Sequence, residues 1–253
     1  MTHDDLQSDR SGKGERLAVA AALVYPTLLT WVYFTCLDGQ APWLQQAAYG
    51  IGKTLQFVLP VVWVWRVRGE RLVETLPSRA NLSRAPSWRA GLGIGLVFGV
   101  AVAAAMLGLY HGGLSSLETF DRARELVRAK VGGFQLDSPA RFIGLSVFYS
   151  LAHSGLEEYY WRWFVFRRLR RLTSLPLAIG VSSVGFMAHH LIPLSTFFGW
   201  SSGLMWLAAA GIVVGGAFWA WLYDRSKQIW GPWVGHLLVD AAIFTIGYHL
   251  IAR

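Results

Sequence analysis

The chain has 253 residues, of which 54% are hydrophobic and only 15% are charged. Because soluble globular domains usually carry about 25% charged residues, this composition excludes an ordinary soluble domain and is typical of a polytopic membrane protein. The formal net charge of +8 does not indicate a nucleic-acid partner, since the basic residues do not gather on a soluble face with stacking aromatics. Cys36 is the single cysteine, which excludes an intrachain disulfide, a thiolate metal cluster and a redox pair.

Polar residues 1–16 predict a flexible cytoplasmic N-terminal tail, followed by an integral membrane domain over 17–253. The first apolar run is too long for the core of a signal peptide and lacks a small-residue cleavage site, so we expect it to remain as a membrane helix. With about 20 residues needed per crossing, the sequence predicts an all-α fold, a polytopic transmembrane bundle of about seven membrane helices. The expected spans are 17–37, 41–65, 90–110, 142–166, 175–198, 203–223 and 234–251.

Basic residues alternate between the connections. Most of them lie in the tail, in the 66–89 linker, in 167–171 and in 225–227, whereas those in 112–141 are offset by acids. Because Lys and Arg concentrate on the cytoplasmic side, we expect a plasma-membrane protein with its N-terminus in the cytoplasm and its C-terminus outside. The 66–89 linker, which contains Pro77 and Pro86, is then predicted to be a cytoplasmic loop that meets anionic lipid heads.

A second connection has helical spacing of its apolar residues. Leu117, Phe120, Ala123 and Val127 recur at three or four residues, with acids and arginines between them. This pattern predicts an amphipathic helix over 117–131 that lies at the membrane interface and acts as a connector.

Three charges interrupt the fourth apolar run. A charged side chain in the middle of a bilayer costs roughly 2.5 to 3.5 kcal/mol, so Glu157, Glu158 and Arg162 indicate a buried polar site. On a helix Glu158 and Arg162 are one turn apart and are expected to form an ion pair, while Glu157 shares its face with His153. Glu157 is then left without a cationic partner and is suited to act as a general base. The structural alternative is a salt bridge beside a protonated glutamate that only holds helices together.

Two later runs carry histidines. Phe186 precedes His190 by four residues, with His189 turned to a different face, and His236 precedes Asp240 by four. A site that attacks with water needs a base, a second group that orients the water and donors for the oxyanion. We expect Glu157 and His190 to hold and activate water, and His236, oriented by Asp240, to face the developing negative charge.

At these residues the chain resembles the CAAX protease and bacteriocin-processing family of intramembrane proteases, also called CPBP, Abi or type II CAAX endopeptidases. Its three motifs match Glu157, Glu158 and Arg162, then Phe186 and His190, and lastly His236 and Asp240. The resemblance implies an intramembrane endopeptidase with a protease-like core at about 142–251, acting on a membrane-associated protein or peptide. In the prenyl-protein proteases Asn is typical at the last position, so Asp240 departs from the pattern.

The resemblance leaves the cofactor open, because the family is often labelled metalloprotease. The candidate ligands for a divalent metal such as zinc are Glu157, Glu158, His190 and His236. No H-E-x-x-H arrangement is present, and water activated by a glutamate needs no metal, so no cofactor is assigned.

Some alternatives stay open at this stage. A transporter or proton-relay protein would also use intramembrane acids and histidines, and a non-catalytic immunity or assembly scaffold would need none of the chemistry. Lys53 either snorkels to the interface or pairs with an acid, and Tyr159, Tyr160 and Trp161 either pack or line a substrate groove. Small residues are expected to allow close helix contact at Gly211, Gly215 and Gly216.

Overall fold

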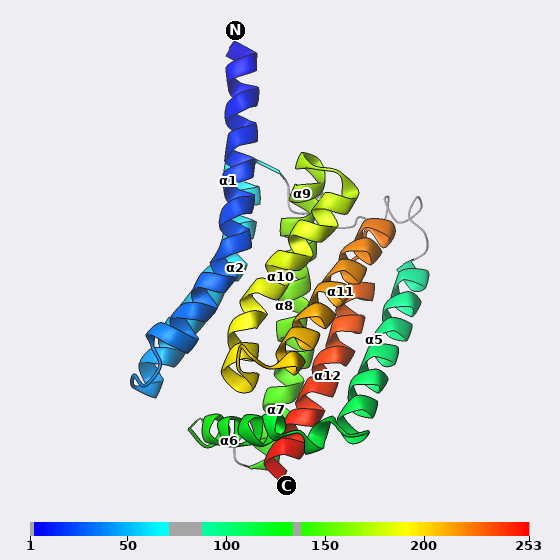
Figure 1. Cartoon of the computed structure of the whole chain (residues 1–253). Coiled ribbons are helices and arrows are strands. Elements are labelled where there is room, and N and C mark those ends of the chain that lie inside the picture. Colours follow the sequence, from blue (N-terminus) through cyan, green and yellow to red (C-terminus); the bar gives the residue numbers. More distant parts are fainter. Residues whose placement is uncertain (1–2, 71–87, 134–137, 253) are drawn as a thin grey trace.

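The fold is described from a computed structural model that covers residues 3–70, 88–133 and 138–252. Within these ranges the secondary structure is helical and contains no strand, as the sequence predicts. Helix α1 begins at one end of the molecule and α12 ends at the opposite end (Figure 1). In the 66–89 linker, residues 71–87 with Pro77 and Pro86 lie outside the described residues.

Six helices in the described part of the chain are long and apolar enough to cross a membrane. The first two continue without a break into short π-helices, η1 (Val32–Cys36) and η2 (Trp63–Val67). Helix α1 begins at His3, so residues 3–16 of the predicted tail are helical, and the cytoplasmic location of the tail stays a prediction. The six spans are built on α1 (His3–Trp31), α2 (Pro42–Val62), α5 (Trp88–His111), α10 (Leu175–Phe198), α11 (Gly203–Ser226) and α12 (Trp230–Ala252).

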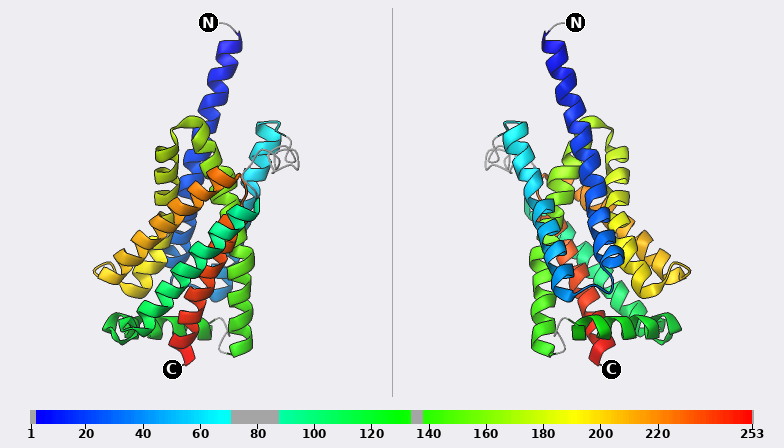
Figure 2. Two further views of the ribbon diagram at one scale, coloured as in Figure 1. Left: turned by 90° about the vertical axis from the view of Figure 1, so that its right-hand side faces the viewer. Right: turned by 90° about the vertical axis from the view of Figure 1, so that its left-hand side faces the viewer.

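The remaining predicted span, 142–166, is helical throughout, with alternating α and π turns, and it is not among these six. Figures 1 and 2 show the column that it forms through the bundle. π-Helical turns often occur at functional sites, and here they flank the short helix that carries both glutamates. The column consists of α7 (Pro139–Phe148), η4 (Tyr149–His153), α8 (Ser154–Glu158), η5 (Tyr159–Phe166) and α9 (Arg167–Leu172).

Among the described elements, helices α5 and α12 make the most extensive contact. A Cβ added at Gly95 of α5 would meet the backbone of Gly231 of α12, one added at Gly231 would meet the carbonyl of Gly91, and one added at Gly99 would meet the backbone of Gly235. Small residues let membrane helices approach to backbone contact, which replaces the hydrophobic driving force that lipid does not supply. The sequence reading missed this glycine seam.

The glycines predicted to mediate helix contact on α11 behave differently from one another. Gly216 packs against Ser183 and Phe186 of α10, as predicted. A Cβ at Gly215 would meet only Trp219 of the same helix, and one at Gly211 would meet nothing within 4 Å. The prediction is therefore confirmed at Gly216 and wrong at Gly211, which is exposed and has no neighbour within 4 Å, and it stays a prediction at the buried Gly215.

Gly95→Ala is expected to lower the free energy of unfolding by about 1–3 kcal/mol, because the new methyl group forces α5 away from the Gly231 carbonyl. Gly93→Ala is the matched control on the same helix, since its Cβ would enter open space. Unfolding in detergent would measure both variants. Equal stability of the two would contradict the backbone contact described for α5 and α12.

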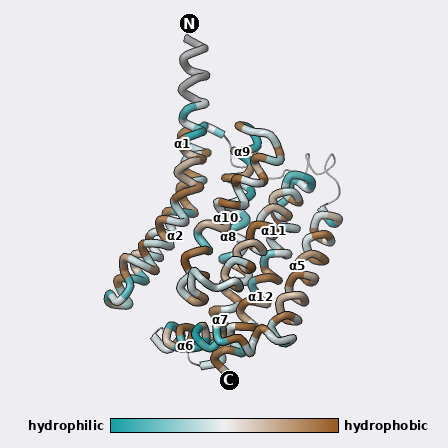
Figure 3. Tube along the Cα trace, viewed as in Figure 1, coloured by the Kyte–Doolittle hydropathy of each residue, from teal (hydrophilic) through white to brown (hydrophobic). Residues whose placement is uncertain are grey.

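Helix α6 (Glu118–Gly133) lies across the end of the bundle at which α12 ends (Figure 1). Its Phe120 and Ala123 are buried against the bundle, and Val127 packs beside Phe120. Along α6 hydrophilic and apolar residues alternate, whereas the long helices are mostly apolar (Figure 3). The predicted amphipathic helix is confirmed as a helix, and its place at the membrane interface stays a prediction.

An ionic cluster, made of Glu15, Arg68, Glu70, Arg168 and Arg171, ties α1 and the end of η2 to α9. The buried Arg168 donates two hydrogen bonds of 2.8 Å to the carboxylate of Glu70 and one of 3.3 Å to Glu15. Arg171 adds a hydrogen bond of 3.0 Å to Glu70, and Arg68 lies 3.4 Å from Glu15. Burial alone would raise the pKa of Glu70, but the hydrogen bonds from the two arginines outweigh it and hold that pKa at about 2.

The lowered pKa of Glu70 predicts that the stability of the protein depends on pH. Because the pKa in the folded state is lower than the usual 4.5, the stabilisation is complete above about pH 4.5 and is lost as the pH falls toward 2. Glu70→Gln should therefore have a lower melting temperature than wild type at pH 6, and the difference should shrink toward pH 2.5. A difference that is constant over this range would contradict the assignment.

Candidate active site

The predicted site residues come together in the middle of the bundle, where α8 packs against α12 and η5 against α10. Glu157 and Glu158 lie on α8, Arg162 follows on η5, and His236 belongs to α12. All four side chains are at most 5% exposed. Burial of this many ionisable groups is costly unless they are paired, so their partners decide what each one can do.

Glu158 is a structural hub with two partners. Its Oε2 lies 3.0 Å from Nε of Arg162, which confirms the predicted ion pair. Its Oε1 accepts a hydrogen bond of 2.8 Å from Nδ1 of His236, a contact that the sequence reading did not foresee. The guanidinium of Arg162 also lies over the rings of Phe186 and Trp219, at 4.9 and 5.4 Å from their centroids. Glu158 and Arg162 thus fix the position of the His236 ring.

Glu157 is surrounded by nitrogen atoms, so the prediction that it lacks a cationic partner is wrong. Its Oε1 lies 3.3 Å from Nε2 of His189, 3.8 Å from Nε2 of His153 and 3.9 Å from Nζ of Lys53. Its other oxygen, Oε2, lies 3.9 Å from Nε2 of His236. The error arose because Lys53 and His189 approach from α2 and α10, and one helix's periodicity does not show which helices become its neighbours.

Both histidines of α10 belong to the site. His189 was expected on a different face, but it is the one that contacts Glu157, with its ring stacked on Trp161 at a centroid distance of 5.6 Å. His190 donates Nδ1–H to the carbonyl of Phe186 at 2.8 Å, because a carbonyl can only accept. Its Nε2 therefore keeps a lone pair when the ring is neutral. The signal for His189 in the sequence was the His-His doublet itself.

His236 lies between three carboxylates. Its Nε2 is 3.5 Å from Oδ1 of Asp240, which agrees with the expected orienting contact, although Glu158 is the closer partner. The indole of Trp219 stacks on the imidazole with the ring centroids 4.5 Å apart. The ring is therefore held from three sides with Nε2 directed toward Asp240 and Glu157.

The aromatic residues after Glu158 mainly pack. The hydroxyl of Tyr159 donates to the carbonyl of Phe57 at 3.1 Å, and that of Tyr160 donates to the carbonyl of Ala22 at 2.7 Å. Trp161 is buried beneath His189. These contacts attach the α1–α2 hairpin to η5 and give the aromatic run a structural role.

Some side chains of this site could serve as ligands of a divalent metal. Among the described residues, Glu157, His189 and His190 offer ligand atoms that all lie within 4.8 Å of one another. Two imidazoles and one carboxylate form a ligand set that catalytic zinc sites use, so the residues fit such an ion by type and spacing. The candidate set changes from that predicted, because Glu158 and His236 are engaged with each other and His189 replaces them.

Comparison with known proteins agrees with this geometry. Residues 139–242 match the model of the family described as type II CAAX prenyl endopeptidase Rce1-like. No curated protein and no solved structure matches the chain. The matched segment contains all three motifs, from Glu157 to Asp240, whereas the whole N-terminal half of the chain, including α1 and α2, lies outside it. The resemblance to the CAAX protease family is thereby confirmed for residues 139–242.

Proposed function

We propose that this protein is an intramembrane endopeptidase that hydrolyses a peptide bond near the C-terminus or membrane anchor of a membrane-associated protein or peptide. The observation that carries the proposal is the position of Glu157, a buried carboxylate with histidines facing both of its oxygens. A general base requires a carboxylate within reach of water and a second group that orients that water. Glu157 and the α10 histidines supply both.

In the proposed reaction the lone pair on Nε2 of His190 accepts a hydrogen bond from the attacking water. Glu157 takes one proton from this water while the oxygen of the water bonds to the scissile carbonyl carbon. His189 holds the carboxylate through its 3.3 Å contact. The carbon–nitrogen bond then breaks, and the proton held by Glu157 passes to the leaving nitrogen.

His236 is suited to stabilise the oxyanion of the tetrahedral intermediate. Its Nδ1–H is engaged by Glu158, and the imidazolium form can donate Nε2–H toward the reacting centre. Glu157 and Asp240 lie on that side of the ring, with carboxylate oxygens 3.9 and 3.5 Å from Nε2. Asp240 therefore orients His236 and need not donate to the oxyanion itself.

A divalent ion held by Glu157, His189 and His190 would act as a Lewis acid and lower the pKa of bound water. The ammonium of Lys53, 3.9 Å from the only carboxylate of this set, would oppose such an ion by charge repulsion. We therefore expect hydrolysis to proceed at an unchanged rate after dialysis against EDTA. Loss of activity that added zinc restores would assign the metal-dependent mechanism instead.

We place the end of the bundle that carries α9 in the cytoplasm of a plasma-membrane protein. Arg167, Arg168, Arg170 and Arg171 gather at this end, and the positive-inside rule favours it as the cytoplasmic side. A cysteine introduced at position 128 of α6 in a Cys36→Ser background, and probed with an impermeant thiol reagent on intact cells, tests the orientation, because the native Cys36 is exposed and would react as well. Labelling from outside supports it.

A reconstitution experiment distinguishes the proposed endopeptidase from a transporter. Purified protein in liposomes is supplied with membrane-anchored peptides, and the fragments are read by mass spectrometry while internal pH is followed. Two fragments from one cleavage position support the endopeptidase. Proton flux without fragments favours a proton-relay protein, and neither signal favours a scaffold.

A further inference from the structure

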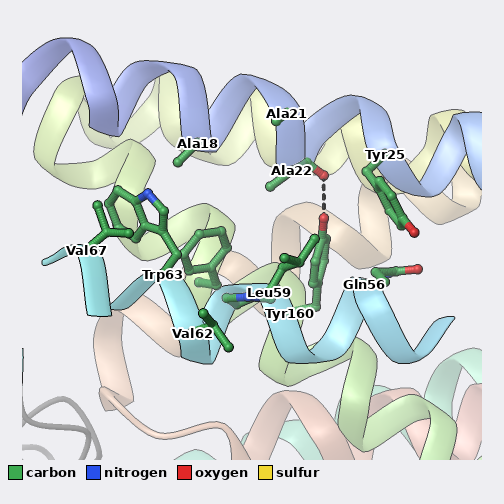
Figure 4. Close-up of a pocket in the computed structure, with 12 residues that line it drawn as sticks. Ala18, Ala21, Ala22, Tyr25, Gln56, Leu59, Val62, Trp63, Val67 and Tyr160 are labelled. Atoms are coloured by element: carbon green, nitrogen blue, oxygen red, sulfur yellow. Dashed lines mark hydrogen bonds between the residues drawn. The ribbon is translucent and has the colours of Figure 1, made fainter. Parts of the chain in front are cut away.

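A cavity of about 310 Å³ lies between α1, α2 and η5, apart from the three motifs. Its wall is almost entirely apolar and includes Ala18, Leu59, Trp63 and Phe164 (Figure 4). Its volume is within the range of small ligand sites, which is about 300–1,000 Å³. The cavity can therefore hold a short apolar segment.

Gln56 is the one amide side chain among the residues that line this cavity, beside the hydroxyls of Tyr25 and Tyr160. It is 1% exposed, and neither its Oε1 nor its Nε2 has a hydrogen-bond partner in the part of the chain that the structure describes. The neighbouring hydroxyls donate elsewhere, since Tyr160 bonds the carbonyl of Ala22 and Tyr25 bonds that of Gly52. A buried amide without partners is unfavourable, so its retention indicates a bound group that supplies them.

The cavity adjoins the reacting centre. Gln56 lies three residues after Lys53 on α2, so both side chains share one face of that helix. Lys53 reaches Oε1 of Glu157 at 3.9 Å, and Tyr160, three residues after Glu157, lines the cavity. The lining of the cavity therefore begins three residues beyond Lys53 on α2 and three residues beyond Glu157 on the column.

The chemistry of Gln56 identifies the class of occupant. The unpaired amide offers one donor group and one acceptor, whereas a hydrocarbon chain offers neither and an ester only accepts. A backbone peptide group offers both. Peptide groups in a helix are already paired, but a substrate unwound for cleavage exposes N–H and C=O groups that lipid cannot satisfy.

We infer that Gln56 pairs with a backbone peptide group of an extended, apolar stretch of the substrate, which lies in the cavity between α1, α2 and η5. This inference rests on the proposed function and adds a positioning residue from outside the segment that matches the family. Gln56 stays remote from the proton transfers, so it affects substrate binding and leaves the chemical step unchanged.

The test uses Gln56→Leu, which keeps the approximate size of the side chain and removes both polar atoms. Because the native amide is unpaired, its loss should leave the melting temperature unchanged or raise it, while KM rises about tenfold and kcat stays within about twofold. Gln46→Leu is the matched control, since Gln46 is exposed on the same helix. A fall in stability that accounts for the lost activity would overturn the inference.

A binding experiment separates this inference from the proposed function, because it needs no cleavage. The probe is a fluorescent octapeptide of alternating leucine and alanine, bound to the Glu157→Gln variant in lipid nanodiscs. A series of the same octapeptide is made in which each member carries an N-methyl group on a different backbone amide and therefore lacks that one hydrogen-bond donor. We expect one methylated peptide to bind about tenfold more weakly, with this difference absent when Gln56→Leu is added.

Two results would contradict the inference. Gln56→Leu without effect on octapeptide binding excludes the paired peptide group. A spin-labelled phospholipid chain that occupies the cavity equally well in wild type and in Gln56→Leu assigns the cavity to lipid. Binding that depends on Gln56 in a protein that cleaves no peptide would preserve the inference about the cavity and reject hydrolysis.

Discussion

Glu157→Gln is expected to lower kcat by about 10³-fold, since general-base catalysis contributes roughly 10²–10⁴ to a rate. The amide keeps the shape of the side chain, and its single oxygen can keep the contacts that Oε1 makes with His189, His153 and Lys53, but it cannot take a proton from water. Substrate binding should therefore persist while hydrolysis stops. The measurement is single-turnover cleavage together with the Kd of the same peptide.

Glu118→Gln is the control for this substitution, because Glu118 is an exposed carboxylate on α6 whose replacement should leave kcat and peptide binding unchanged. His190→Ala should lower kcat as well, through loss of the group that orients the water. Wild-type kcat in Glu157→Gln, with wild-type binding, would remove Glu157 from the mechanism.

Arg162→Met is expected to cost about 3–5 kcal/mol of unfolding free energy, the usual cost of removing one partner of a buried ion pair. Glu158 would keep a charge at a fully buried position with only His236 as its partner. The cation–π contacts with Phe186 and Trp219 would be lost as well. Denaturant unfolding in detergent would measure the difference.

A second substitution tests the cause of that loss. Adding Glu158→Gln to Arg162→Met should recover part of the stability, because the unpaired charge is removed along with its partner. Arg128→Met, on the exposed face of α6, should change stability by no more than about 0.5 kcal/mol. Additive effects of the Glu158 and Arg162 substitutions would mean that the two side chains do not act as a pair.

The features that could be predicted from sequence are those encoded along one helix. Apolar length located six spans, and the four-residue spacings of Glu158 with Arg162 and of His236 with Asp240 gave contacts that the structure contains. The charge penalty in lipid made Glu157 conspicuous although nothing about its partners was known.

The features that escaped prediction depend on neighbouring helices. Lys53 contacts Glu157 from α2, and the bond between His236 and Glu158 joins α12 to α8. Contact between Gly95 and Gly231 likewise depends on which helices pack together. Hydrophobic periodicity shows which face of a helix is buried but not which helix packs against it. The π turns, such as those of η5, leave no distinct pattern in the residues.

The most direct test of water activation by Glu157 is cleavage in H₂¹⁸O. Wild-type protein in liposomes cleaves a membrane-anchored peptide, and mass spectrometry measures the isotope in the new carboxyl group, with product incubated alone as the exchange control. The account predicts one ¹⁸O atom in every new C-terminus and no product from Glu157→Gln. Product without solvent oxygen, or an equal yield from Glu157→Gln, would contradict it.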